Sequence, residues 1–176
     1  MPDFTHSFFI RRFIRIVACF GGLVLIVACG QGAQKNTPSE VPYFTNLRPD
    51  EAWGRRGPSY RQPVLWEYRR RGLPLLVIDE TTFWRQVLDP QGDRVWMHKS
   101  LLSRRAIVMV MADQPIPLYR TMGDDQTVVA YADPQALLRL GPCQGDRCQL
   151  RKDKIRGWAN KADLWGVDIP KKALLD

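Results

Sequence analysis

The sequence predicts an all-β chain in which two small barrels follow an N-terminal export segment. Runs of four or five residues rich in Val, Leu, Ile and Trp alternate with Gly, Pro and Asp, which is typical of short strands joined by turns. Between residues 43 and 106 no window shows the apolar stripe of a helix. The segment RVWMHKSLL (94–102) returns in altered form as RGWANKADL (156–164), which indicates a duplicated module of about sixty residues.

Four identical residues carry the repeat at one common offset of 62 positions. They are Arg94, Trp96, Lys99 and Leu102, which recur as Arg156, Trp158, Lys161 and Leu164. A length of 176 residues fits one or two domains, and the repeat favours two. Because a domain of about sixty residues buries only about 60% of its unfolded surface, each half needs large aromatic side chains or a disulfide.

The chain is basic, with a formal charge of +8. Residues 1–28 hold three Arg and one Asp, so the remainder carries a formal charge of +6. Such a surplus favours anionic surfaces, for example phospholipid headgroups or cell-wall polymer, although a solvated basic surface that keeps a small protein soluble explains it equally. The export segment argues against nucleic acid as a partner.

Residues 1–28 are interpreted as a signal peptide. Arg11, Arg12 and Arg15 precede an uncharged run from Ile16 to Ala28. This run of 13 residues is shorter than the ~18 to 20 that span a membrane, and it matches the ~7 to 15 of a signal-peptide core. Residues 29–42 lack an apolar period and contain Pro, so we expect a flexible tether.

The end of the apolar run, Ile26 to Cys29, resembles the bacterial lipobox. The resemblance implies that Cys29 is acylated, becomes the mature N-terminus and anchors the chain to a membrane. Ordinary signal-peptidase cleavage or an uncleaved anchor are the alternatives. Gly30 stands where an Asp typically retains lipoproteins in the inner membrane, which favours the outer membrane.

The two modules are predicted at 43–106 and 107–176. Strands expected in the first are Val64–Tyr68, Leu75–Ile78, Trp84–Leu88 and Arg94–His98. Strands expected in the second are 115–120, 127–131, 136–140, 148–151, 156–159 and 165–167. The apolar run Ile107 to Met111 lies at the boundary, where it could be the last strand of the first barrel or a bridge between the barrels. We favour the last strand of the first barrel.

The stretch from Leu47 to Ser103 resembles the bacterial SH3-like (SH3b) domain, in the tandem form typical of exported alphaproteobacterial proteins. The motifs that carry the resemblance are Arg55-x-Gly57-Pro58, Tyr60, Pro63 to Trp66, Gly72 to Pro74, Trp84-Arg85 and the closing Trp96 to Leu102. The second half matches less well because the opening motif is missing. Trp53 and Gly54 stand where the family has Asn and a small aliphatic residue, and Val95 stands where it has Gly.

Two of the four cysteines, Cys143 and Cys148, flank a four-residue loop that reads as a hairpin turn. Directly opposed strand positions lie ~4.5 to 5.5 Å apart at Cα, within the ~4.4 to 6.8 Å that a disulfide tolerates. We therefore expect a disulfide in an oxidising periplasm. A redox-active pair is the alternative, although thioredoxin-type chemistry uses the closer Cys-x-x-Cys spacing.

The sequence shows no catalytic motif. His98 is the one His beyond the export segment, and no HExxH, paired Cys-x-x-Cys, phosphate loop or GxSxG elbow is present. We expect no enzyme activity, no metal and no cofactor, and we interpret His98 as a partly exposed turn residue.

A basic and aromatic stretch supplies the candidate binding surface, which comprises Arg56, Tyr60, Tyr68, Arg69 and Arg70. Aromatic faces flanked by Arg suit stacking on sugar rings or peptide planes and paired hydrogen bonds to carboxylates. Trp66 and Trp84 are instead expected in the core, because barrels this small need large side chains inside.

The resemblance implies a non-catalytic periplasmic adaptor that binds peptidoglycan or a peptide segment of another envelope protein. Two alternatives remain open at this point. One is a structural spacer or assembly subunit without a small ligand, and the other, less favoured, is a periplasmic thiol oxidoreductase.

Overall fold

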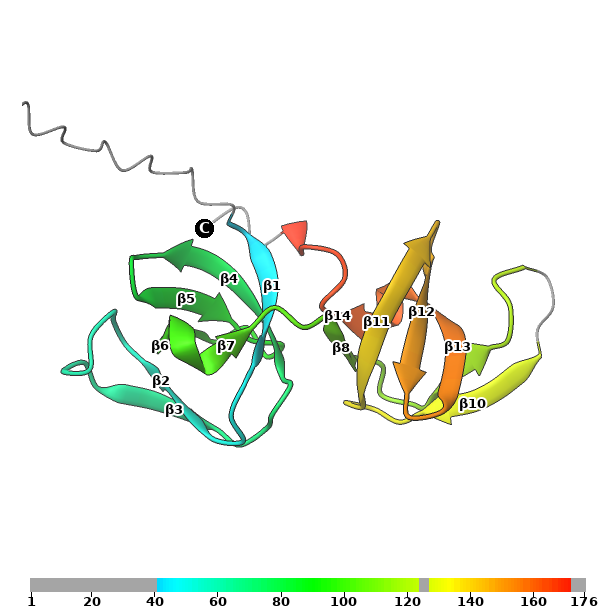
Figure 1. The fold of residues 1–176 in the computed structure, drawn as a ribbon, viewed down its shortest axis with the longest axis horizontal. Helices are drawn as coiled ribbons and strands as arrows, with labels where there is room; N and C mark the ends of the chain where they lie inside the picture. The colour runs from blue at the N-terminus through cyan, green and yellow to red at the C-terminus, as the bar shows by residue number, and fades with distance from the viewer. Residues whose placement is uncertain (1–40, 124–126, 172–176) are drawn as a thin grey trace, which may run out of the picture. The chain divides into compact units, whose positions relative to one another are not determined.

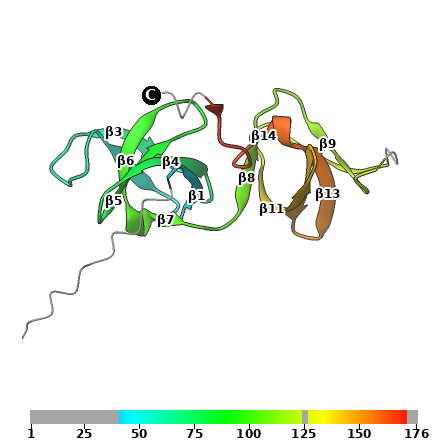
Figure 2. The ribbon, with the colours of Figure 1, turned by 90° about the horizontal axis from the view of Figure 1, so that it is seen from above.

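The computed structural model describes residues 41–123 and 127–171. These residues form two antiparallel sheets of seven strands each. Figures 1 and 2 show the ribbon from two directions. They contain no helix long and apolar enough to cross a membrane. The predicted export segment, Cys29 and most of the tether lie outside the described residues.

The first sheet follows the order β3-β2-β6-β5-β4-β1-β7. Its elements are β1 (Tyr43–Leu47), β2 (Ala52–Arg55), β3 (Val64–Tyr68), β4 (Pro74–Glu80), β5 (Trp84–Leu88), β6 (Arg94–His98), the 3-10 turn η1 (Lys99–Leu101) and β7 (Leu102–Ser103). The bounds expected for β3, β5 and β6 are confirmed. The sequence does not predict β1, because its central residues Thr45 and Asn46 are polar although the fold buries them.

The second sheet repeats this order as β10-β9-β13-β12-β11-β8-β14. Its elements are β8 (Ile107–Val110), β9 (Ile116–Tyr119), β10 (Val128–Ala132), β11 (Leu137–Gln144), β12 (Arg147–Lys152), β13 (Ile155–Asn160), the 3-10 turn η2 (Lys161–Asp163) and β14 (Leu164–Trp165). Each strand of the first sheet thus has a counterpart seven strands later. The predicted all-β fold and the tandem repeat are both confirmed.

The prediction that the run from Ile107 to Met111 closes the first barrel is wrong. β8 hydrogen-bonds with β11 and β14 in the second sheet, and it is the counterpart of β1. A short apolar run satisfies either barrel, so only its hydrogen-bond partners could decide. Successive side chains of a strand point to opposite faces, and accordingly Met109 packs in the first core while Val108 and Val110 pack in the second.

Partly buried Leu137 and Trp165 of the second half also pack against the first core, and apart from these contacts each half has its own hydrophobic core. The first gathers Leu47, Leu75, Val77, Val87, Val95 and Met97, and the second gathers Ile116, Leu118, Leu138, Cys148, Leu150 and Leu164. The expected disulfide is confirmed: Cys143 on β11 is bonded to Cys148 on β12, its directly opposed partner, with the Cα atoms 4.0 Å apart. The bridge ties the β11–β12 hairpin to the second core through buried Cys148.

Two of the three residues that depart from the SH3-like pattern, Gly54 and Val95, meet in one core contact. A Cβ added to Gly54 on β2 would lie 2.6 Å from Val95 Cγ2 on β6. In the second half, a Cβ added to Gly157 on β13 would lie 2.7 Å from the Cβ of Leu118 on β9. Since Arg55 pairs with Trp96 and Tyr119 pairs with Trp158, these contacts are counterparts with the small and large residues exchanged. The departures therefore compensate each other.

This compensation predicts a strong coupling between positions 54 and 95. Gly54→Leu should destabilise the first barrel by about 1–3 kcal/mol through overpacking, and Val95→Gly by roughly 2–4 kcal/mol through a cavity and added backbone freedom. The double variant recreates the arrangement of the second barrel, so its loss should be smaller than the sum by about 0.5–3 kcal/mol. Urea unfolding followed by Trp fluorescence measures all three.

Gly123→Leu is the matched control, because no atom lies within 4 Å of a Cβ added at Gly123. It should leave the unfolding midpoint nearly unchanged. Strict additivity of the two single changes would show that Gly54 and Val95 do not compensate.

Candidate functional site

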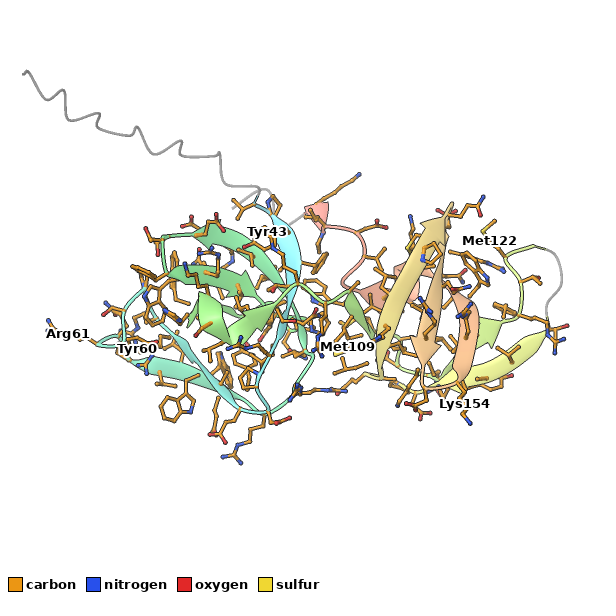
Figure 3. The ribbon with its side chains drawn as sticks, in the orientation of Figure 1. Tyr43, Tyr60, Arg61, Met109, Met122 and Lys154 are labelled. Carbon is orange, nitrogen blue, oxygen red and sulfur yellow. A yellow bond between two sulfur atoms is a disulfide. The ribbon has the colours of Figure 1, made fainter. Side chains whose placement is uncertain are left out.

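A cleft of about 380 Å³ opens on the outer surface of the first barrel. Its lining consists of Glu51, Ala52, Trp53, Arg55, Tyr60, Trp84, His98 and Leu101. These side chains come from β2 and the residue before it, from the loop between β2 and β3 where Figure 3 labels Tyr60, from the adjoining ends of β5 and β6, and from η1. Trp84 and His98 meet because they stand directly opposite each other in the β5–β6 hairpin.

Arg55 holds the loop that forms one wall of the cleft. Its guanidinium Nη1 donates to the backbone oxygens of Tyr60 at 3.0 Å and of Gln62 at 2.8 Å. The same guanidinium lies 5.6 Å from the centre of the Tyr60 ring. At the base of the loop the Arg56 amide donates to the Pro63 oxygen. An exposed loop is thereby fixed in one place without a core of its own.

Four rings, Tyr60, Phe83, Trp84 and His98, form an aromatic platform. Tyr60 packs edge-on against Trp84 at 4.9 Å and stacks with His98 at 5.8 Å between ring centres. Phe83 lies nearly parallel to His98 at 6.4 Å. Trp84 is buried, but Tyr60 and Phe83 are exposed, and exposed Trp53 adds a further face to the cleft. Large apolar rings open to water offer stacking surfaces to a ligand.

His98 is held in the platform by its own turn. Its Nδ1 caps η1 by accepting the backbone N–H of Ser100 at 3.3 Å, and it also lies 2.7 Å from the Ser100 Oγ. Because a backbone amide can only donate, Nδ1 is the acceptor and Nε2 is the ring nitrogen that carries the proton in the neutral side chain. His98 is partly exposed, as expected. Its position is set by the ring stack as well as by the turn.

The structure brings only one of the predicted surface residues into the cleft. Tyr60 lines it, and Arg56 is exposed in the same loop without lining it. Arg69 is instead paired with Glu67 at 2.8 Å, and hydrogen bonding to this guanidinium lowers the pKa of the Glu67 carboxyl. Arg70 donates to the backbone oxygen and the side-chain Oε1 of Gln135 in the second half.

The prediction that Tyr68 lies on the surface is wrong. Tyr68 stands opposite Ala52 on the inward face of β3 and is 8% exposed. Its hydroxyl donates to Asp89 Oδ2 at 3.0 Å. The other oxygen of Asp89 accepts the amides of Gln91, Gly92 and Asp93 at 2.9 Å each, which closes the β5–β6 turn.

The core prediction holds for Trp84 but is wrong for Trp66. Trp84 is 8% exposed, whereas Trp66 is 51% exposed. Trp66 lies on β3, the edge strand of the first sheet, opposite Gly54. An edge strand has a neighbour on one side only, so a ring at this position is not covered from both sides.

Sequence reasoning missed Trp53, Phe83 and Leu101 as parts of one site. The available signal was the hairpin register: strands ending at Leu88 and beginning at Arg94 place Trp84 opposite His98. Trp53 stood out only as a departure from the family pattern. Nothing in the local sequence tells that β2 runs beside β6, because 38 residues or more separate these strands along the chain.

The second barrel does not repeat the platform. Arg147 stands opposite Asn160 there, as Trp84 stands opposite His98 in the first barrel. The Arg147 guanidinium lies 4.9 Å from the centre of the Tyr119 ring and donates to the Met122 oxygen at 3.3 Å. Among the described residues, no group of three or more His, Cys, Asp or Glu is arranged to hold a metal ion.

Comparison with known protein families gives one match in each half. A model of the bacterial SH3 domain matches residues 48–104 and again residues 112–166. No curated protein matches the chain.

Burial and the nearby Asp89 carboxylate raise the pKa of Tyr68 far above its usual value. The folded protein therefore keeps the Tyr68 proton that the unfolded chain loses above about pH 10, so stability must fall as the pH rises past that point. Tyr68→Phe should cost about 1–3 kcal/mol at neutral pH, because it removes a hydrogen bond to a buried carboxylate. The gap in unfolding free energy between the two proteins should narrow from about pH 8 to about pH 11. A gap that stays constant would mean that Tyr68 titrates normally.

Proposed function

The chain belongs to the bacterial SH3 domain family, with one domain in each half, and from this premise we propose that it is a non-catalytic binding protein of the cell envelope. Its ligand is peptidoglycan or a peptide segment of a periplasmic protein, and the cleft of the first barrel receives it. The observation that carries the proposal is the aromatic platform, which is open to solvent although its loop is held rigidly by Arg55.

The lining of the cleft suits recognition of a chain that is both planar and polar. Tyr60 and Trp53 in the lining, and Phe83 stacked with His98 beside it, present faces that stack on sugar rings or peptide planes. Arg55 and Glu51 add one charge of each sign. A rigid binding surface loses little conformational entropy when a ligand docks. Domains of this family are typically binding modules, which agrees with a non-catalytic role.

Two features support an exported location, which the proposed function requires. The Cys143–Cys148 disulfide fits an oxidising compartment, and residues 1–28 have the pattern of a signal peptide. We assign the disulfide a structural role, because it joins opposed strand positions rather than a Cys-x-x-Cys pair. The protein then resides in the periplasm, anchored through Cys29 and preferentially to the outer membrane.

Binding to purified peptidoglycan tests the proposed function. Tyr60→Ala should weaken co-sedimentation about tenfold or more, since truncation of an aromatic residue central to an interface costs about 2 kcal/mol or more. Trp53→Ala should act in the same direction. Peptidoglycan without its stem peptides shows which part of the polymer is bound. If it still binds the protein, the ligand is the glycan; if binding is lost, the ligand is the stem peptide.

Tyr131→Ala is the matched control. Tyr131 lies on β10 of the second barrel and is 67% exposed, the same fraction as Tyr60. Equal loss on both changes would indicate nonspecific adhesion of surface rings. If neither change alters binding, the cleft does not bind peptidoglycan, and a protein peptide as ligand or the spacer role is favoured instead.

Mass spectrometry of the mature protein tests the anchor. We expect an N-terminal Cys29 that carries acyl chains, and Cys29→Ser should abolish both acylation and processing at this position. A mature N-terminus downstream of Cys29 would show ordinary cleavage instead.

A further inference from the structure

Three arginines form an unbroken row across the second barrel. Arg139 on β11 stands directly opposite Arg151 on β12, and Arg151 stands directly opposite Arg156 on β13. All three side chains are exposed, while the next residues in register, Leu140, Leu150 and Gly157, belong to the inward face. Neighbouring strands lie about 4.8 Å apart, so the row brings three positive charges within about 10 Å.

Nothing in the fold requires this row. The corresponding positions of the first barrel are Leu76, Leu88 and Arg94, which pair in the same register on β4, β5 and β6. Leu76 and Leu88 are buried there. Two apolar positions of a shared fold have thus become charged and exposed in the second barrel alone.

The charges of the row are not neutralised within the described residues. Like charges directly opposite each other in a sheet are destabilising. In the part of the chain that the structure describes, the ion pairs are Arg69–Glu67, Arg71–Asp50 and Arg85–Glu80. None of these pairs includes an arginine of the row. Three neighbouring positive charges without a partner lower the stability of the fold, and a bound anion removes this repulsion.

Two clefts share Arg139 and Arg151 of the row as part of their walls. One, of about 540 Å³, is lined by Arg71, Arg139, Arg151, Lys152 and Asp153 together with the apolar residues around them. The other, of about 360 Å³, is lined by Arg105, Ala106, Ile107, Arg139, Leu140 and Arg151. The hairpin turn adjoining the row reads Arg151-Lys-Asp-Lys-Ile-Arg156, with Lys154 at its tip (Figure 3). Ile155 in this turn is 48% exposed.

We propose that this arginine row, with the β12–β13 turn, is a second binding site, and that its ligand is the phosphate groups of an anionic membrane surface. Guanidinium groups bind phosphate oxygens through paired N–H donors. Several phosphates side by side, as in a bilayer surface, satisfy three spaced guanidiniums at once. An exposed Ile among basic side chains is the combination that reaches past headgroups into the apolar boundary of a bilayer. The site lies on a different barrel from the aromatic cleft and does not depend on the proposed function.

Partition of the full chain onto lipid vesicles tests the site. The quantity measured is the ratio of binding to phosphatidylglycerol-containing vesicles over binding to pure phosphatidylcholine vesicles. All variants share the N-terminal segment, so its contribution to this ratio cancels when variants are compared. Each basic side chain near an anionic surface strengthens binding about fivefold. The triple variant Arg139→Gln, Arg151→Gln, Arg156→Gln should therefore lower this ratio about 100-fold at low salt.

A second triple variant, Arg48→Gln, Arg61→Gln, Arg120→Gln, removes the same charge from exposed positions outside the row. It should lower the ratio less than fivefold. Equal losses in the two triple variants would overturn the site, since net charge alone would then explain binding. Titration with soluble pyrophosphate distinguishes a free phosphate from a lipid headgroup as the ligand. If pyrophosphate binds saturably at the row and the protein shows no preference for anionic vesicles, the ligand is a soluble anion and the proposed membrane ligand is wrong.

Thermal unfolding without ligand gives an independent readout. Arg151→Gln removes the central charge, so at low salt it should raise the melting temperature, and high salt should abolish the gain. A lower melting temperature would show that Arg151 has a stabilising partner in the native protein, which contradicts an uncompensated row.

Discussion

The close approach of β2 to β6 is the contact on which the binding cleft depends. β2 can lie against Val95 only because position 54 has no side chain. The next residue, Arg55, is thereby placed beside Trp96, from where its guanidinium reaches the carbonyls of the β2–β3 loop. That loop in turn holds Tyr60 against Trp84 and His98. A contact between small and large residues in the core therefore sets the geometry of a surface site.

The duplication keeps the barrel and changes what each copy shows to solvent. The pair that is Trp84 and His98 in the first barrel is Arg147 and Asn160 in the second. The row that is Leu76, Leu88 and Arg94 in the first is all arginine in the second. The strand order is the same in both and these positions pair equivalently, so the differences at these positions lie in the side chains. One copy has an aromatic face and the other a cationic face, which fits two different kinds of ligand on one chain.

Much of the fold could be predicted from the sequence, because it rests on local signals. The turns rich in Gly, Pro and Asp gave β3, β5 and β6 their bounds, and the spacing of Cys143 and Cys148 gave the disulfide. The misassignment of β8 and the omission of β1 have one cause. Both strands take their partners from far along the chain, and neither an apolar run nor a buried polar pair identifies such partners.

The candidate site was harder to predict for the same reason. Tyr60 was recognised because its loop is local, whereas Trp53 and Phe83 join it only through the pairing of distant strands. Alternation places Trp66 and Tyr68 on the same face of β3, so it could not tell which of the two side chains the core covers. On an edge strand such as β3, that choice depends on what the neighbouring strand leaves uncovered.

The exchange of small and large residues between the halves bears on how the chain sorts itself while folding. Tandem domains with the same strand order are prone to trading strands during synthesis. A hybrid in which β2 met β13 would set Gly54 against Gly157 and leave a void, and one in which β9 met β6 would force Leu118 into Val95. Neither hybrid fits, so each half recognises its own strands, and the chain discriminates against mispaired barrels without any difference in topology.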